Sequence, residues 1–243
     1  MKLQISNLKH INTRPQGLGV WCLMCVWSLG LGIWGFRCEA TDTNAVLNAW
    51  LAAQTNLHTW TADFTQTRTL KTLTQPLVAT GHIWFATPNR FRWELGSPAK
   101  TIALRNADDM FVIYPRLKRA EKYALGGSAS GEWRDMLSLL DAGFPRNRAD
   151  LDSRFQVLSL TEADGSWQLT LQPRSAFARK MMSEIRVGLA TNSFSLTSTE
   201  LVFVDGSQMR NDFTNSALNP AFDEKIFDWK PDPDFKVTEP LKK

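Results

Sequence analysis

The chain has 243 residues, with 28 basic and 24 acidic side chains and a formal net charge of +4. Four of the bases and one of the acids lie in the first forty residues, so the rest of the chain is close to neutral. Near-neutrality gives no support to binding of nucleic acid or of an anionic membrane surface. The three cysteines (Cys22, Cys25 and Cys38) also lie in those forty residues, so residues 41–243 can form no disulfide and must rely on a hydrophobic core.

The first forty residues have the order of a secretory signal. A basic stretch without acidic residues, 1–15, precedes an apolar run of 19 residues, Leu18 to Phe36. The small residues Cys38 and Ala40 follow, which predicts cleavage after Ala40 and export. Export without disulfides favours the bacterial periplasm. An uncleaved membrane anchor is the alternative, because such a run can just span a bilayer; lipid attachment at Cys38 is disfavoured by the bulky Phe36 close before it.

Residues 41–243 are expected to begin with an amphipathic helix from about Thr43 to Leu57. Thr41, Asp42 and Thr43 supply N-cap side chains, and the apolar residues that follow mark one helical face. From residue 60 the apolar period falls to two, which is typical of strands. The segment "RFRWEL" (90–95) alternates most clearly, and we expect its arginines, Arg90 and Arg92, to face water.

Six strands are expected before residue 126, at 60–70, 77–87, 90–95, 100–106, 110–115 and 117–125. The segment "GGSASG" (126–131) predicts a flexible joint, and an apolar helix with Met136, Leu137 and Leu140 on one face follows it. A polar helical turn at 146–154 precedes five further strands, expected at 155–160, 165–173, 183–190, 194–204 and 207–216. The Pro-rich tail from Asn219 is expected to dock as an extended strap.

Eleven consecutive antiparallel strands must curl, because sheets twist. We therefore expect one α+β domain, mainly β, over residues 41–243, after a signal peptide at residues 1–40. Its single curved antiparallel sheet of about eleven strands would be covered by only two or three helices. The apolar concave face is then under-filled, which is typical of a lidded site for an apolar ligand.

Groups for catalysis are scarce in residues 41–243. Two histidines remain, His58 and His82, and no zinc-binding, nucleophile-elbow or phosphate-loop motif occurs. The carboxylate pairs Asp108-Asp109 and Asp223-Glu224 are adjacent in sequence, whereas glycoside hydrolysis needs carboxylates that face each other across a cleft. We therefore expect no enzyme, no cofactor and no metal, with a periplasmic hydrolase as the less favoured alternative.

Two segments carry a resemblance to a known family: "FTQ" at Phe64–Gln66 and "GHIWFATPNRFRW" at Gly81–Trp93. With the order of elements, they resemble the periplasmic outer-membrane lipoprotein carriers of the LolA type. The resemblance implies an unclosed β-barrel capped by helices around an apolar cavity. It also implies a monomeric carrier that accepts acylated lipoprotein cargo from an inner-membrane ABC-type exporter, shields the acyl chains and delivers the cargo to an outer-membrane receptor.

Under this hypothesis the lipid-binding cavity has a sheet side and a lid side. Its expected lining residues are Trp50, Phe64, Ile83, Phe91, Trp93, Phe111, Met136, Leu137 and Leu140. Members of the family commonly have an arginine before the Pro-Asn turn, where this chain has Thr87. A carrier or sensor of another lipid or glycolipid in the same fold therefore remains an alternative, as does a structural interaction domain.

Overall fold

The computed structural model describes residues 42–125 and 142–240. The leader, the glycine–serine joint and the apolar helix with Met136, Leu137 and Leu140 lie outside the described residues and stay predictions. The described residues belong to one compact unit, Thr41–Lys243.

Three α-helices, two short 3₁₀ helices and twelve strands occur in the described ranges. In chain order they are α1 (Thr43–Thr55), β1 (Thr59–Thr69), β2 (Leu77–Ala86), β3 (Arg90–Leu95), β4 (Thr101–Arg105), β5 (Asp109–Tyr114), η1 (Pro115–Leu117), β6 (Arg119–Ala124), α3 (Arg148–Arg154), β7 (Phe155–Ala163), β8 (Ser166–Pro173), α4 (Ala176–Met181), β9 (Met182–Ala190), β10 (Leu196–Phe203), β11 (Gln208–Leu218), η3 (Glu224–Phe227) and β12 (Lys236–Thr238). The eleven expected strands are confirmed, and β12 is an addition.

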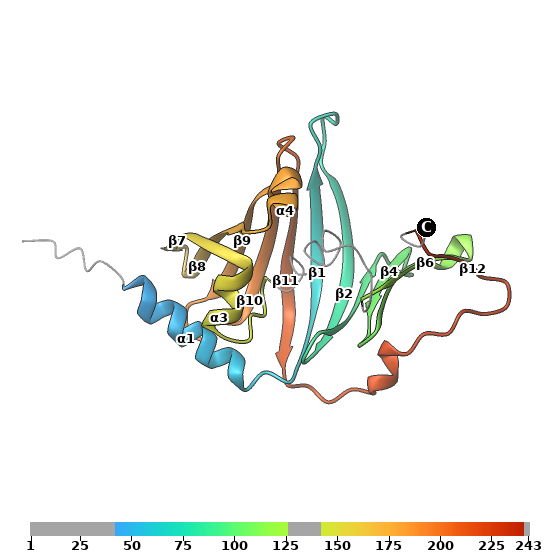
Figure 1. The fold of residues 1–243 in the computed structure, drawn as a ribbon, viewed down its shortest axis with the longest axis horizontal. Helices are drawn as coiled ribbons and strands as arrows, with labels where there is room; N and C mark the ends of the chain where they lie inside the picture. Colours follow the sequence, from blue (N-terminus) through green and yellow to red (C-terminus); the bar gives the residue numbers. More distant parts are fainter. Residues whose placement is uncertain (1–41, 126–141, 241–243) are drawn as a thin grey trace, which may run out of the picture. The chain divides into compact units, whose positions relative to one another are not determined.

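The strands form one sheet in the order β12-β6-β5-β4-β3-β2-β1-β11-β10-β9-β8-β7. Neighbours are antiparallel, apart from β12, which pairs with β6 in parallel. The long β1–β11 ladder joins the two halves of the sheet (Figure 1). Because the end strands β12 and β7 are not neighbours, the sheet is an unclosed barrel, as expected.

One face of the sheet, here called the inner face, carries the helices. Asp42 caps α1 by accepting a hydrogen bond from the Asn44 backbone N–H, and α1 buries Leu47, Trp50 and Leu51 in the larger core cluster. The same cluster holds Leu151 of α3 and the inward side chains of β8 and β9. Helices α1 and α3 therefore cover the β7–β11 half of the sheet.

The other face, here called the outer face, is covered by the chain after β11. This segment, residues 219–240, is the C-terminal strap, and it packs on β2–β6 through a second apolar cluster. Phe227 of η3 is 1% exposed, and the Trp229 ring lies 5.3 Å from that of Phe111. The tail thus docks as a strap, and β12 is its end.

The strap corrects the expectation that Arg90 and Arg92 face water. Arg90 Nη1 lies 2.8 Å from Glu224 Oε2, and its guanidinium stacks over the Phe227 ring at 5.2 Å. Arg92 donates to the Ile226 carbonyl at 3.1 Å. Alternation placed both arginines correctly on the outer face, but that face is buried under the strap, so the arginines hold the strap in place.

Gly81 has a packing role in the centre of the sheet. On β2 it pairs with Phe64 of β1 and with Leu95 of β3. A Cβ atom there would come within 2.1 Å of the Glu94 carbonyl oxygen and 2.3 Å of the Phe64 ring. The missing side chain therefore makes the space in which Phe64 lies across β2.

Candidate functional site

The inner face contains a cavity of about 230 Å³ between the two halves of the sheet. Strands β1–β5 and β9–β11 and the loop before α3 line it, and none of the lining side chains that the structure describes is charged. Its aromatic lining consists of Trp60, Phe85, Phe91, Trp93, Phe144 and Phe213. Such a wall suits an uncharged, apolar ligand.

The aromatic rings pack edge-on rather than in flat stacks around most of the cavity. The Phe213 ring lies 5.2 Å from Trp60 and 6.1 Å from Trp93, both in edge-to-face arrangements. At one end of the wall Phe144 stacks on Phe85, with ring centroids 4.3 Å apart and an interplanar angle of 12°. These contacts fix the wall on both sides of β1.

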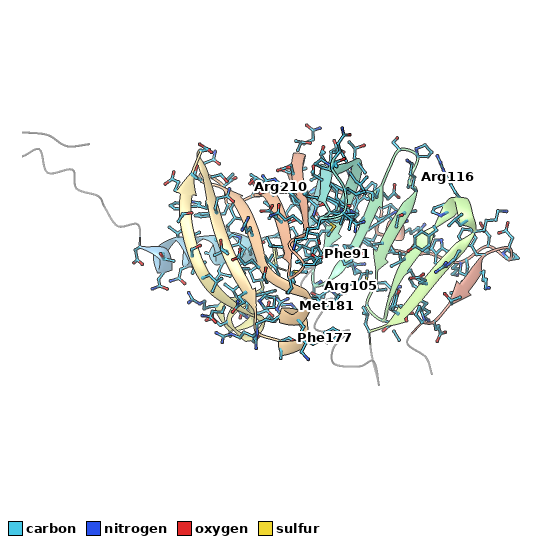
Figure 2. All side chains as sticks on the ribbon, turned by 90° about the horizontal axis from the view of Figure 1, so that it is seen from above. Phe91, Arg105, Arg116, Phe177, Met181 and Arg210 are labelled. Carbon is cyan, nitrogen blue, oxygen red and sulfur yellow. The ribbon has the colours of Figure 1, made fainter. Side chains whose placement is uncertain are left out.

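The structure brings three of the expected residues to the cavity. Ile83, Phe91 and Trp93 line it, and Phe91 of β3 lies beside Arg105 of β4 (Figure 2). Phe64 lies just behind the wall, 2% exposed, with its ring 4.2 Å from that of Trp93. Trp50 is fully buried in the core under α1 and does not line the cavity.

Phe111 does not line the cavity either, which corrects the prediction. It pairs with Leu104, which pairs with Arg92, so all three lie on the outer face, where Phe111 packs against Trp229. The segment "MFVIY" is apolar on both faces because the strap buries one of them. Its sequence pattern therefore could not tell which face is inner, and its neighbour Met110 lines the cavity instead.

Sequence reasoning missed a polar row in the cavity wall. Gln66 of β1 pairs with Asn211 of β11, and Asn211 pairs with Thr199 of β10. Gln66 Nε2 donates to Asn211 Oδ1 at 3.0 Å, and Asn211 Nδ2 donates to Thr199 Oγ1 at 3.1 Å. Trp60 and Phe213 were missed as well, although both share the alternation of Phe64 or Asn211 and could have been found from it.

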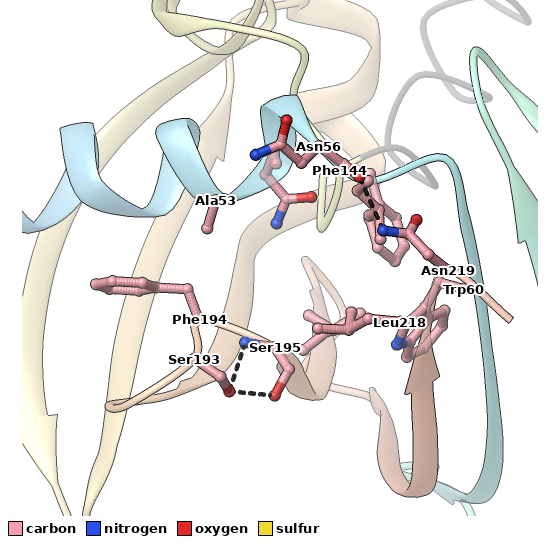
Figure 3. A pocket seen from close by; sticks show the side chains of 12 residues that line it. Ala53, Asn56, Trp60, Phe144, Ser193, Phe194, Ser195, Leu218 and Asn219 are labelled. Atoms are coloured by element: carbon pink, nitrogen blue, oxygen red, sulfur yellow. Dashed lines mark hydrogen bonds between the residues drawn. The ribbon is translucent and has the colours of Figure 1, made fainter.

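Two further pockets adjoin the aromatic end of the cavity. One, of about 170 Å³, is ringed by Trp60, Phe144, Phe194 and the end of α1 (Figure 3). The other, of about 320 Å³, includes His58, Thr87 and Phe144. Thr87 donates its backbone N–H to the His58 carbonyl oxygen at 2.9 Å, and its side-chain hydroxyl lies 3.4 Å from the same oxygen. Phe144 borders all three spaces.

Among the described residues, the ionisable groups with shifted pKa values are not part of the cavity lining, although Tyr123 pairs with the lining residue Met110. Hydrogen bonds from Asn215 and His82 hold the pKa of the Asp63 carboxyl below its ordinary value, and these three groups lie on the outer side of β1 and its neighbours. Burial and a hydrogen bond to Glu121 raise the pKa of Tyr123 to about 12. A shifted acid or base aimed into the cavity, which catalysis would need, is not found among the described residues.

The acidic pairs show no catalytic arrangement. The Asn106 side chain accepts hydrogen bonds from the backbone N–H groups of Asp108 and Asp109, as in a turn, and Asp109 pairs with Lys122 at 3.0 Å. In residues 42–125 and 142–240, no group of three or more His, Cys, Asp or Glu side chains could hold a metal ion. None of the helices in these ranges has the length and hydrophobicity needed to cross a membrane.

An unclosed sheet around a cavity whose described lining is uncharged, with a strap over the outer face of β2–β6, is the architecture of a binding protein for apolar guests. The family model of the outer membrane lipoprotein carrier protein LolA matches residues 55–230, and the chain belongs to this family. It is a lipoprotein or lipid carrier of the LolA fold.

Curated relatives carry the same description. The chain is 28% identical to an outer-membrane lipoprotein carrier protein of Bordetella avium, over 66% of this chain and 71% of the relative. It is 25% identical to one of Xanthomonas axonopodis pv. citri, over 63% and 68%. Among solved structures, a putative outer membrane lipoprotein-sorting protein domain from Vibrio parahaemolyticus superposes with a TM-score of 0.43 and 11% identity, covering 75% of this chain and 94% of that one.

Proposed function

We propose that this protein is a periplasmic carrier that shields the acyl chains of lipoproteins and shuttles them from the inner to the outer membrane. The observation that carries the proposal is the cavity of about 230 Å³ on the inner face, whose described lining residues carry no charge. Each CH₂ group exposed to water costs about 0.8 kcal/mol, so acyl chains need such a shelter to cross an aqueous space.

Ile83, Phe91 and Trp93 are the expected residues that we assign to the wall of this shelter. Met136, Leu137 and Leu140 stay proposed as its lid. The family membership and the names of the relatives support lipoproteins as the cargo. An inner-membrane ABC-type exporter as donor and an outer-membrane receptor as acceptor belong to the same proposal, as does a monomeric carrier without catalytic activity.

The test uses the full chain expressed with its own leader and purified from the periplasmic fraction of a Gram-negative host. Mass spectrometry should find co-purifying acylated protein, and the stripped carrier should bind a fluorescent fatty-acyl probe. Leu201→Glu, which puts a charge at the cavity wall, should abolish probe binding. Leu117→Glu is the matched control, because Leu117 is 71% exposed and lies on η1, away from the cavity. Lipid-free protein that also ignores the probe would contradict the proposal.

A second candidate is a carrier or sensor of another lipid or glycolipid in the same fold. It is favoured by Thr87, whose side chain offers a single hydroxyl where the family resemblance implies a guanidinium. Mass spectrometry of the co-purifying species separates the two candidates: free lipid without attached protein would support the second and contradict the first.

A further inference from the structure

The polar row interrupts the apolar character of the cavity wall. Gln66, Thr199 and Asn211 lie side by side on three neighbouring strands, β1, β10 and β11, and all line the cavity. Gln66 is 8% exposed and Asn211 is 4% exposed. Carboxamides buried this deeply in an apolar wall are unfavourable unless their hydrogen-bonding groups find partners.

The row stands at the rim of the wall. Along the inner side of β1, the exposed fraction is 1% at Trp60, 2% at Phe64 and 8% at Gln66, and Arg68, the next residue on that side, is exposed. Leu201 and Met209, one step beyond the row on β10 and β11, are half-buried. A ligand whose apolar chains fill the aromatic part of the cavity therefore passes the row on its way out.

The row has hydrogen-bonding capacity left over. Each carboxamide has two N–H groups and one carbonyl oxygen, and each hydroxyl can donate once. Within the described ranges, the Gln66 side chain makes one hydrogen bond and the Asn211 side chain makes two, all inside the row. One N–H of each carboxamide, the Gln66 carbonyl oxygen and the Thr199 hydroxyl proton are left, so three of the four remaining groups are donors.

Donors without a positive charge suit a neutral acceptor. A phosphate or a carboxylate would lose its hydration in this wall without meeting a cation there, because no lining side chain among residues 42–125 and 142–240 is charged. A neutral carbonyl oxygen loses much less hydration free energy than an anion does, and it can accept a hydrogen bond from the donors at the rim. We propose that Gln66, Asn211 and Thr199 form a subsite for the neutral ester or amide carbonyl that links acyl chains to the rest of the cargo.

This subsite rests on the proposed carrier function and specifies the cargo: acyl chains joined through carbonyl linkages, in preference to chains of equal length joined through ethers. The probes are a diacylglycerol with one fluorophore-labelled chain and its dialkyl ether counterpart, which lacks only the carbonyl oxygens. The full chain should bind the ester probe about two- to tenfold more tightly, which is what one net hydrogen bond contributes.

Gln66→Leu and Thr199→Val should each lower the ester-to-ether affinity ratio, because each removes a hydrogen-bond donor that only the ester carbonyl can use. Gln168→Leu is the matched control, because Gln168 lies on β8 outside the cavity lining and donates to Ser166 at 3.1 Å. Its ratio should equal that of the unchanged protein. If Gln66→Leu does not fold, Thr199→Val decides, because it removes a hydroxyl from a half-buried side chain at nearly constant shape.

The outcomes separate the two proposals. Equal affinities for ester and ether in the unchanged protein would overturn the subsite and leave the carrier function standing. A preference for the ester that survives Gln66→Leu and Thr199→Val would also overturn the subsite, because the carbonyl would then be recognised elsewhere. Failure of both probes to bind would overturn the carrier function itself.

Discussion

Ala103→Phe tests whether the cavity is open to a guest. Ala103 of β4 pairs with Trp93 and Val112, lines the cavity and is half-buried, so a larger side chain at this position extends into the empty volume. Leaving 230 Å³ of cavity unfilled costs about 5.5 kcal/mol at about 24 cal/mol per Å³. A guest that fills the cavity recovers this cavity term, in addition to the free energy that its own apolar groups gain by leaving water.

A phenyl ring that fills about a third of this volume lowers the guest's binding free energy by about 2 kcal/mol, which is roughly twentyfold in affinity. The ring also buries itself, which contributes at most about 1.5–3 kcal/mol. After the loss of side-chain freedom we expect the ligand-free protein to be about 1 kcal/mol more stable, with a Tm about 2–4 °C higher.

The assay pairs a titration with a fluorescent fatty-acyl probe with thermal unfolding of the ligand-free protein. Ala163→Phe is the matched control, because Ala163 is exposed at the end of β7 and should alter neither quantity. Unchanged probe affinity in Ala103→Phe, together with a lower Tm, would refute the reasoning, because it would mean that the protein's own side chains already fill this space.

Three further predictions concern the packing on either side of the sheet. Gly81→Ala should lower the free energy of unfolding by about 3 kcal/mol in a denaturant titration, because its Cβ meets the Phe64 ring and a backbone oxygen. Phe227→Ala should expose the C-terminal strap to protease and leave fatty-acyl probe affinity unchanged, because Phe227 lies on the outer face. Arg90 lowers the pKa of Glu224, so this pair stabilises the strap above the ordinary pKa of 4.5 and the contribution is lost as the pH falls through the lowered value. Hydrogen exchange of η3 should therefore accelerate on acidification, and Glu224→Gln should remove that pH dependence.

The strands could be predicted because their alternation is local. Where one face is buried and the other polar, as in "RFRWEL", period two fixes both the strand and its sides, and β3 spans the expected residues 90–95. The turn at Asp164-Gly165 could also be predicted locally, because Asp-Gly is favoured in two-residue hairpin turns that require positive φ angles. The structure has φ angles of 52° and 68° at these residues. Helix α4 was not expected, because its six residues are too few to show a helical period between two strands.

The features that escaped prediction depend on contacts between distant segments. The sequence prediction placed Arg90 in water and Phe111 in the cavity. In the structure they contact Glu224 and Trp229, which lie more than a hundred residues later in the chain. Gln66 belonged to a recognised motif, but its partner Asn211 lies 145 residues away, so the polar row becomes visible only when β1 and β11 pair. Sequence periodicity shows which side chains share a face and not what will cover it.

The sheet leaves β7 and β12 unpaired with each other, and this has a mechanical consequence. In a closed barrel, strand number and stagger fix the radius, and widening the barrel would break hydrogen bonds around the ring. Here the two halves can splay or tighten by small changes in twist at each ladder, with every ladder still paired. An open sheet of this kind can change the width of its cavity to fit cargoes of different size with little loss of backbone hydrogen bonds.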